Sequence, residues 1–263
     1  MYDFHTHTAF SEDSDTPMGD MISAAEKLGI QKLAVTDHCD PDFPDPVWSF
    51  YLDFEDYWHA LCEKEEEHKN RIDILKGIEI GIQNGDTLAK CRDDVEMFPY
   101  DIVIGSFHAF NGHDLDRRDF SGIDQAEIVP RFYENMYNCL LEYSDFDIIG
   151  HFNLIDRYID FKPDYTAVRD IIAEILDILI KEDKTIEINT SSYRYGMGEH
   201  THASKEILEL YHDLGGRNVS YGSDAHSPEY LGWEYKKACG ILQAAGFKKL
   251  SVYKRRQRSE VDF

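Results

Sequence analysis

Short runs of apolar and β-branched residues alternate along the chain with longer segments in which apolar residues recur every three or four positions. Short runs of this kind, bounded by turn residues, are typical of buried strands. The pattern predicts seven strands, at residues 2–5, 32–37, 73–80, 101–106, 146–150, 185–189 and 218–222.

The segments between these strands show helical periodicity, clearest between residues 166 and 182. The apolar residues at helical spacing there are Val168, Ile171, Ile172, Ile175, Leu176 and Leu179. Helices are predicted near residues 17–29, 53–70, 86–96, 124–143, 166–182, 204–215 and 229–246. Strict alternation of strand and helix implies parallel strands with right-handed crossovers. Because no linker interrupts the alternation, we expect one α/β domain over residues 1–263, forming a closed or nearly closed barrel.

Composition and charge exclude several classes of protein. Hydrophobic residues make up 42% of the chain and aromatic residues 13%, enough for a sizeable core. The 51 acidic residues outnumber the 27 basic ones, giving a formal net charge of −24, which disfavours nucleic acid as a partner. The ordinary interpretation of the basic stretch at residues 248–258 is a solvated tail or a last strand, and binding of an acidic partner or phosphate is the alternative.

The location is predicted from cysteine usage and hydropathy. The five cysteines are scattered and form no CxxC pair, which indicates a reducing compartment rather than a disulfide framework. No apolar run approaches the roughly 20 residues needed to cross a bilayer. We therefore expect a soluble cytoplasmic protein with no membrane partner, as a monomer or a homodimer.

Metal-binding side chains follow nearly every predicted strand. In an α/β barrel the carboxyl ends of the strands build one mouth, so these residues converge although they are far apart in sequence. Imidazole and carboxylate ligands suit zinc, manganese or iron, and a carboxylate such as Glu79 can bridge two ions. The set comprises His5, His7, Asp13, His38, Glu79, His108, His151, Asp224 and His226.

The other histidines provide a contrast. His59, His68 and His212 fall on predicted helices, where a surface position is the ordinary interpretation. The remaining three lie in predicted loops from which they can approach the mouth, and their roles stay open: His113, His200 and His202.

The order of these motifs resembles a known family. The strings HTHTAFSED at residues 5–13, TDH at 36–38, GIEIG at 77–81, GSFH at 105–108, GHF at 150–152 and GSDAH at 222–226 are similar to motifs of the polymerase-and-histidinol-phosphatase (PHP) metallohydrolase superfamily. Two further strings, EINTSSYR at 187–194 and KEILELYHDLGG at 205–216, resemble its histidinol-phosphate phosphatase branch.

The resemblance implies a distorted (β/α)7 TIM-like barrel with a trinuclear site of divalent zinc, manganese or iron. Carried over position by position, one ion is held by His5, His7, Glu79 and Asp224, and Glu79 bridges to a second ion held by His108 and His151. The third ion is held by Asp13, His38 and His226. Many relatives carry histidine where this chain has Asp13, and an oxygen ligand there favours manganese or iron over zinc.

The resemblance also implies an activity. It predicts a metal-dependent phosphomonoesterase that hydrolyses the small molecule L-histidinol phosphate, in histidine biosynthesis, by attack of a metal-bridging hydroxide. Glu79, Asp224 and His226 are the predicted catalytic residues, and Arg157 and Arg194 are the predicted substrate ligands.

Three alternatives stay open at this point. The first is a phosphatase of the same superfamily that acts on phosphotyrosine or on another small phosphomonoester. The second is a non-catalytic metal-binding accessory module, which the complete ligand set disfavours. The third is a nuclease, which the negative charge disfavours.

Overall fold

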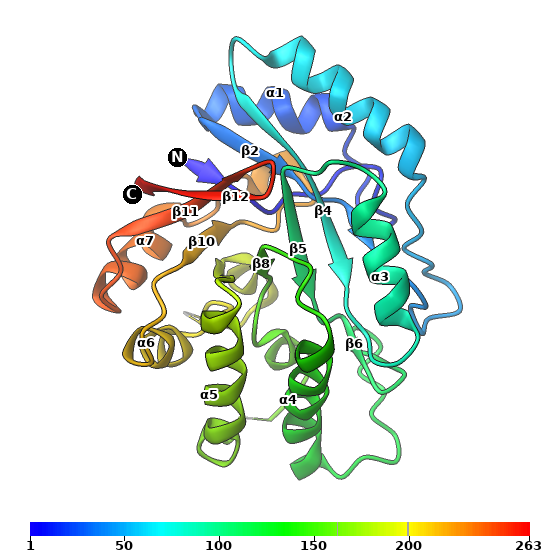
Figure 1. Ribbon diagram of the computed structural model, residues 1–263, viewed down its shortest axis with the longest axis vertical. Coiled ribbons are helices and arrows are strands. Elements are labelled where there is room, and N and C mark those ends of the chain that lie inside the picture. The colour runs from blue at the N-terminus through cyan, green and yellow to red at the C-terminus, as the bar shows by residue number, and fades with distance from the viewer. Residues whose placement is uncertain (162, 199) are drawn as a thin grey trace.

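A parallel sheet forms the centre of the computed structural model, which describes residues 1–161, 163–198 and 200–263. In this part of the chain the strands follow one another in the spatial order β1-β2-β4-β5-β8-β9-β10 (Figure 1). Each of the seven predicted strands is present. Their bounds are β1 (Tyr2–Asp3), β2 (Lys32–Val35), β4 (Asp73–Gly81), β5 (Ile102–Ser106), β8 (Ile148–Ile149), β9 (Thr185–Asn189) and β10 (Val219–Gly222).

The first and last strands meet and nearly close the sheet into a barrel. The backbone N–H of Phe4 donates to the carbonyl oxygen of Tyr221 over 3.1 Å, and that of His7 donates to Ala225 over 2.9 Å. Thr6 and Ala225 form a parallel bridge between these bonds. The predicted α/β barrel is therefore confirmed.

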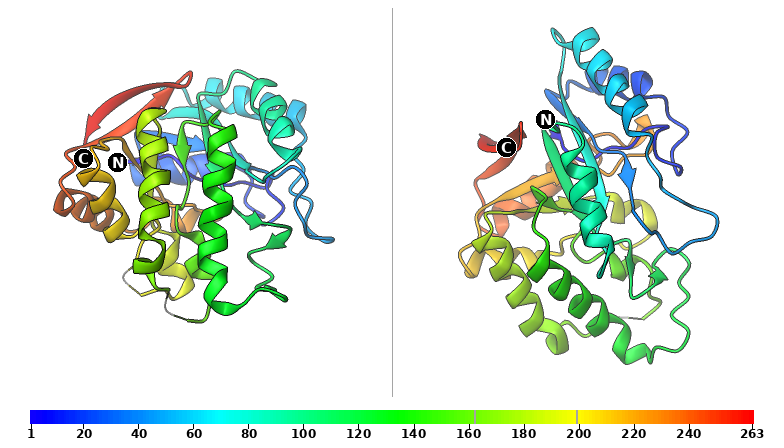
Figure 2. Two further views of the ribbon diagram at one scale, coloured as in Figure 1. Left: turned by 60° about the horizontal axis from the view of Figure 1, so that its bottom comes forward. Right: turned by 45° about the vertical axis from the view of Figure 1, so that its right-hand side comes forward.

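Helices cover the outside of the barrel (Figure 2). On α5 five residues of the predicted apolar face are buried and Ile171 is partly buried. The five are Val168, Ile172, Ile175, Leu176 and Leu179. Side-chain oxygens cap several helix starts, as acidic and hydroxyl residues commonly do. The helices are α1 (Met18–Leu28), α2 (Phe54–His68), α3 (Thr87–Glu96), α4 (Gln125–Glu142), α5 (Tyr165–Lys181), α6 (Lys205–Asp213) and α7 (Tyr235–Ala244).

The predicted boundary of the last helix is wrong. The sequence pattern places its start at residue 229, whereas α7 begins at Tyr235. A short 3-10 helix, η3 (Pro228–Tyr230), comes first. Gly232 and Glu234 then have φ angles of +63° and +53°, in the left-handed region that a continuous helix does not use.

In the described part of the chain, five strands lie outside the seven predicted ones. Strand β3 (His38–Cys39) extends the pairing of β4, and β6 (Ala109–Phe110) forms a hairpin with β7 (His113–Asp114). The antiparallel pair β11 (Lys249–Lys254) and β12 (Gln257–Asp262) ends the chain.

The basic stretch at 248–258 lies within this last hairpin and packs against the amino ends of the barrel strands. Val252 and Tyr253 of β11 join Phe4, Leu75 and Ile102 in an apolar cluster of buried residues. The interpretation as a last strand is thus the correct one of the two. No helix among the described residues is both long and apolar enough to cross a membrane.

Candidate metal centre and substrate cavity

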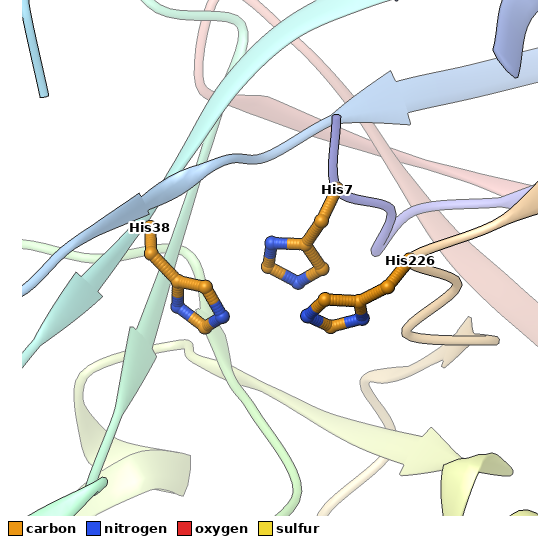
Figure 3. A group of neighbouring side chains, drawn as sticks. All are labelled: His7, His38 and His226. Atoms are coloured by element: carbon orange, nitrogen blue, oxygen red, sulfur yellow. The ribbon is translucent and has the colours of Figure 1, made fainter. Parts of the chain in front are cut away.

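The predicted ligand side chains lie together at the carboxyl ends of the strands. They come from segments far apart in sequence, as Figure 3 shows for three of them. The rings of His38 and His226 stack on that of His7, each with centroids 4.2 Å from it. These rings follow β2, β10 and β1 respectively, so the closure of the barrel brings them together.

Glu79, in β4, lies at the centre of the cluster and is wholly buried. Its Oε2 atom is 3.1 Å from Nε2 of His5 and 3.0 Å from Nδ1 of His38. The same oxygen lies 3.4 Å from Nε2 of His7. One carboxylate oxygen thus faces three imidazoles.

The second oxygen of Glu79 faces a different pair of imidazoles. Oε1 lies 2.9 Å from Nε2 of His151 and 3.3 Å from Nε2 of His108. Ser106 also donates to this oxygen over 2.5 Å. A carboxylate with a separate set of nitrogen donors at each oxygen has the arrangement of a bridging ligand.

Asp224 and Asp13 occupy the remaining sides of the cluster. Oδ1 of Asp224 is 3.4 Å from Nε2 of His7 and 3.6 Å from Nδ1 of His226. Oδ2 of Asp13 is 3.0 Å from Nε2 of His226 and 3.6 Å from Nε2 of His38. Asp13 is the most exposed of these carboxylates, so its side of the cluster opens to solvent.

Unpaired buried atoms test whether the cluster fits metal ions. In the described part of the chain, Nε2 of His5, Nε2 of His7, Nδ1 of His38 and Oε2 of Glu79 are buried without a hydrogen-bond partner. Buried polar atoms normally have partners, and these atoms lie close together without hydrogen-bond geometry. Imidazole nitrogens and carboxylate oxygens are the ligands of zinc, manganese and iron, so the residues fit the predicted ions.

Several triplets of donor atoms lie within 4.8 Å of one another. Among the described residues they are His7, His38 and His226; His5, His7 and Asp224; His5, Glu79 and His151; and His38, Asp40 and His108.

Electrostatics hold some ligands in the protonation state that binds metal, whereas neighbouring carboxylates outweigh burial and raise the pKa of His5, His38 and His108, where metal would replace a proton. Burial raises the pKa of Glu79, but the imidazoles of His5 and His38 outweigh burial and hold that pKa well below its usual value. Burial, together with the neighbouring His226 and His38, holds the pKa of His7 well below its usual value. Metal ions bind ionised carboxylates and neutral imidazoles, which are the forms favoured at Glu79 and His7.

Two buried carboxylates, which the sequence did not predict as part of the site, contact the Nδ1 atoms of ligand imidazoles. Oδ1 of Asp40 lies 2.7 Å from Nδ1 of His108, and Oε1 of Glu187 lies 2.8 Å from Nδ1 of His5. Oε2 of Glu187 accepts the backbone N–H of His151 over 2.8 Å. A carboxylate on one ring nitrogen fixes the tautomer and leaves the other nitrogen free to bind a metal.

Glycines make room for both carboxylates. A Cβ atom at Gly81 would lie 1.9 Å from Oδ1 of Asp40, and one at Gly222 would lie 1.9 Å from Oε1 of Glu187. These glycines end strands β4 and β10. A usable signal was present in the sequence, because Asp40 follows His38 at the same two-residue spacing as the H-x-H pair.

A cavity of about 310 Å³ opens beside the cluster. Ligand side chains, among them His108 and His151, form its floor. Aromatic side chains form its walls, and Asp114 and Asp116 add negative charge near the rim. The aromatic residues are Phe43, Trp48, Phe50, Tyr158 and Tyr195.

Arg157 lines this cavity, as expected of a phosphate ligand. It lies in the 3-10 helix η1 (Leu154–Arg157), its side chain is 9% exposed, and it donates to Oγ of Ser191. Its guanidinium lies 4.1 Å from the ring centroid of Tyr195. Its Nε atom is buried and has no hydrogen-bond partner in the described part of the chain, so a donor remains for a ligand.

Arg194 has a different environment. Its Nη1 and Nη2 atoms donate to the carbonyl oxygens of Ser223 and Asp224 over 2.8 and 2.7 Å. It does not belong to the described residues that line the cavity. These contacts hold the segment that carries Asp224, and a direct contact of Arg194 with substrate stays a prediction.

The three histidines predicted in loops have different environments. His113 lies in β7, and its Nδ1 is 2.9 Å from the carbonyl oxygen of Asp119. His200 is exposed, whereas His202 is wholly buried and pairs through its backbone with Asn189 at the end of β9.

A family comparison agrees with this geometry. The model of the PHP domain family matches residues 3–191, which carry most of the ligand cluster. The chain belongs to this family. The family resemblance of the sequence motifs is therefore confirmed.

Relatives match nearly the full length of the chain. It is 28% identical to a probable histidinol-phosphatase of Clostridium acetobutylicum, over 97% of this chain and 98% of the relative. It is 26% identical to the histidinol-phosphatase of Lactococcus lactis, over 95% and 93% of the two chains. A probable phosphatase of Pectobacterium carotovorum is 26% identical over 99% of this chain and 92% of the relative.

A solved structure has the same fold. The histidinol phosphate phosphatase of Lactococcus lactis, crystallised with zinc, L-histidinol and phosphate, superimposes with a TM-score of 0.86. The match covers 98% of both chains at 24% identity. The expected distorted TIM-like barrel is thereby confirmed.

Proposed function

We propose that this protein is a metal-dependent phosphomonoesterase that hydrolyses L-histidinol phosphate to L-histidinol and phosphate. The observation that carries the proposal is the set of unpaired buried nitrogen and oxygen atoms around Glu79, next to a cavity lined by Arg157. Such a donor set suits divalent cations, and cations with a buried arginine suit a phosphate dianion.

The proposed ligand assignment places one ion near each carboxylate oxygen of Glu79 and a third beside Asp13. His5, His7, Glu79 and Asp224 hold one ion, and Glu79 bridges to an ion held by His108 and His151. Asp13, His38 and His226 hold a third. Divalent ions bound there supply Lewis-acid stabilisation of phosphoryl oxygens and lower the pKa of the attacking water.

The residues of the chain bind and orient the two halves of the substrate. The unpaired Nε of Arg157 suits a phosphate oxygen. The aromatic walls and the rim carboxylate Asp116 suit a planar organic group with positive charge, as in L-histidinol. Full-length relatives named histidinol-phosphatase support the same substrate.

A substrate panel tests this proposal. Protein loaded with zinc or manganese should release phosphate from L-histidinol phosphate with a kcat/KM at least about tenfold above that for phosphotyrosine or other small phosphomonoesters. Arg157→Gln should raise KM strongly, whereas Arg169→Gln, on the outside of α5, should not. Equal kcat/KM across the panel contradicts the substrate assignment and favours a broad phosphatase, the function suggested by the relative named probable phosphatase.

We further propose a cytoplasmic location. The cysteines of this chain, Cys39, Cys62, Cys91, Cys139 and Cys239, are free thiols, which suits a reducing compartment. Fractionation of cells that express the protein tests this location.

A further inference from the structure

Two neighbouring segments at the cavity mouth are joined by an ion pair. The aromatic loop, residues 43–50, supplies Phe43, Trp48 and Phe50 to one wall. The 115–118 turn, which follows β7, supplies Asp116 to the rim. The loop and the β6–β7 hairpin lie side by side (Figure 2), and Nε of Arg117 donates to Oδ2 of Asp45 across the boundary.

Asp45 organises the aromatic loop from within. Its Oδ1 accepts the backbone N–H groups of Val47 and Trp48 over 2.6 and 2.9 Å. The Asp45 side chain is wholly shielded from solvent, whereas Arg117 is 48% exposed. The hydrogen bond from Arg117, with those from Trp48 and Val47, holds the pKa of Asp45 below its usual range, so Arg117 stabilises the charged form that accepts the loop N–H groups.

Glu12 forms a second contact that holds the aromatic loop, at Ser49. Oε1 and Oε2 of Glu12 accept the hydroxyl and the backbone N–H of Ser49 over 2.8 and 3.0 Å. The ring of Phe50 lies 5.1 Å from that of His38 and 6.0 Å from that of Trp48, centroid to centroid. A shift of the loop therefore moves the wall against the metal ligands.

The neighbouring arginine supports the opposite wall. Nη2 of Arg118 donates to the carbonyl oxygen of Arg157 over 3.2 Å. The two adjacent arginines of the turn thus point to different partners, and Arg117 is not among the described residues that line the cavity. Arg117 reaches the cavity wall through its hydrogen bond to Asp45, and its Nε also lies 3.9 Å from Oδ2 of Asp114 at the rim.

We propose that Arg117 is a positioning residue that determines specificity for the organic part of the substrate. Through Asp45 it holds Trp48 and Phe50 in place, and it does not contact the phosphate. The identity of the substrate in this proposal rests on the proposed function.

Steady-state kinetics test the proposal. Arg117→Gln should raise KM for L-histidinol phosphate about tenfold and leave kcat within about twofold, because it weakens uniform binding of the organic group. The inhibition constant of inorganic phosphate, which has no organic group, should stay unchanged. Arg117→Lys, which can restore the ion pair, should recover most of the lost affinity.

Matched variants define the controls. Asp45→Asn should reproduce the effect of Arg117→Gln, and the double variant should be no worse than either one, since both break one interaction. Arg131→Gln removes an arginine of similar exposure, 45%, from an ion pair with Glu127 on α4 and should change nothing. Additive effects, a fall in kcat at constant KM, or weaker phosphate inhibition overturns the proposal.

Fluorescence tests the loop without any substrate. The emission of Trp48 is isolated by subtracting the spectrum of Trp48→Phe in each background. Arg117→Gln should shift this emission to longer wavelength as Trp48 becomes more exposed, whereas Arg131→Gln should not. An unchanged spectrum overturns the proposal. If the native protein does not hydrolyse L-histidinol phosphate, the proposed function fails, and fluorescence still decides the role of Arg117.

Discussion

The two ends of the barrel stabilise their buried carboxylates in different ways. At the carboxyl ends of the strands, Glu79 and Asp224 lie among imidazoles, and several of the facing atoms have no hydrogen-bond partner in the described chain. At the amino ends, Asp101 and Asp147 lie against the β11–β12 hairpin, whose basic side chains pair with them.

Both oxygens of each amino-end carboxylate accept hydrogen bonds. Asp101 accepts the backbone N–H groups of Lys76 and Arg255, both over 3.0 Å, and Nζ of Lys254 over 3.1 Å. Asp147 accepts the backbone N–H of Val103 over 2.8 Å and Nε of Arg256 at 3.1 and 3.2 Å.

The carboxylates at the amino ends therefore contribute to stability, whereas those at the carboxyl ends are placed for function. Permanent side-chain cations balance the carboxylates at the amino ends, whereas the proposed metal ions balance those at the mouth. A net charge of −24 is therefore compatible with an anionic substrate, because bound cations reverse the local potential at the cavity.

The largest expected effect is at the centre of the mouth. Glu79→Gln should lower the rate of phosphate release about a thousandfold, because the proposed bridge between ions is lost. The barrel should remain folded by circular dichroism, since the amino-end contacts are intact. Retained turnover contradicts the ligand assignment.

At the amino ends a substitution is expected to lower stability and leave activity unchanged. Asp147→Asn should lower the free energy of unfolding by about 2 kcal/mol, because it removes the charge that Nε of Arg256 faces, while Nη1 of Arg256 still pairs with Asp145. The activity per folded molecule should not change. Glu260→Gln, in an exposed pair with Lys249 on the same hairpin, should cost less than about 0.5 kcal/mol in urea titrations. A loss of activity without a loss of stability in Asp147→Asn would erase the contrast between the two ends.

Glu187 is a carboxylate at the carboxyl ends of the strands that orients a ligand and is not itself one of the proposed ligands. Glu187→Gln should weaken zinc binding about 10- to 100-fold, since the carboxylate on Nδ1 of His5 is lost. Competition with a chromophoric chelator measures the affinity. Glu182→Gln, at the exposed end of α5, is the matched control. Equal zinc affinity in both variants refutes a positioning role for Glu187.

The smallest effect is in the pH dependence of the metal-free protein. Burial lowers the pKa of His38, but the carboxylates of Glu79 and Asp13 raise it from 6.5 to about 9 overall. Because the folded-state pKa lies above the unfolded one, this stabilisation is complete below about pH 6.5 and is lost as the pH rises through about 9.

Urea titrations across this pH range test the linkage. The metal-free protein should lose stability between pH 6.5 and 9. The loss should disappear in His38→Asn, and zinc should suppress it because the metal replaces the proton. An equal loss in His38→Asn assigns the pH dependence to another group.

Much of the fold and the cluster could be predicted because both follow from short-range pattern and topology. Periodicity locates strands such as β9 (Thr185–Asn189), and a parallel barrel brings strand ends together whatever their separation in sequence. His7 and His226 therefore meet, with ring centroids 4.2 Å apart, although they lie at opposite ends of the chain.

Features that depend on contacts between distant side chains could not be predicted. The roles of Asp40 and Glu187 depend on which ring nitrogen each carboxylate faces. His68 is a wrong prediction of the same kind: it lies on an acidic helix but is buried, with Nδ1 2.7 Å from Oε1 of Glu26 on α1. The direction of Arg194 towards backbone carbonyls likewise has no signal in its motif.

The most direct test of the central claim is the rate of phosphate release from L-histidinol phosphate before metal removal, after it, and after zinc or manganese is returned. The stripped protein should be inactive and still folded, and returned metal should restore the rate. Full activity in the stripped protein, or none in the fully metal-loaded protein, would contradict the central claim.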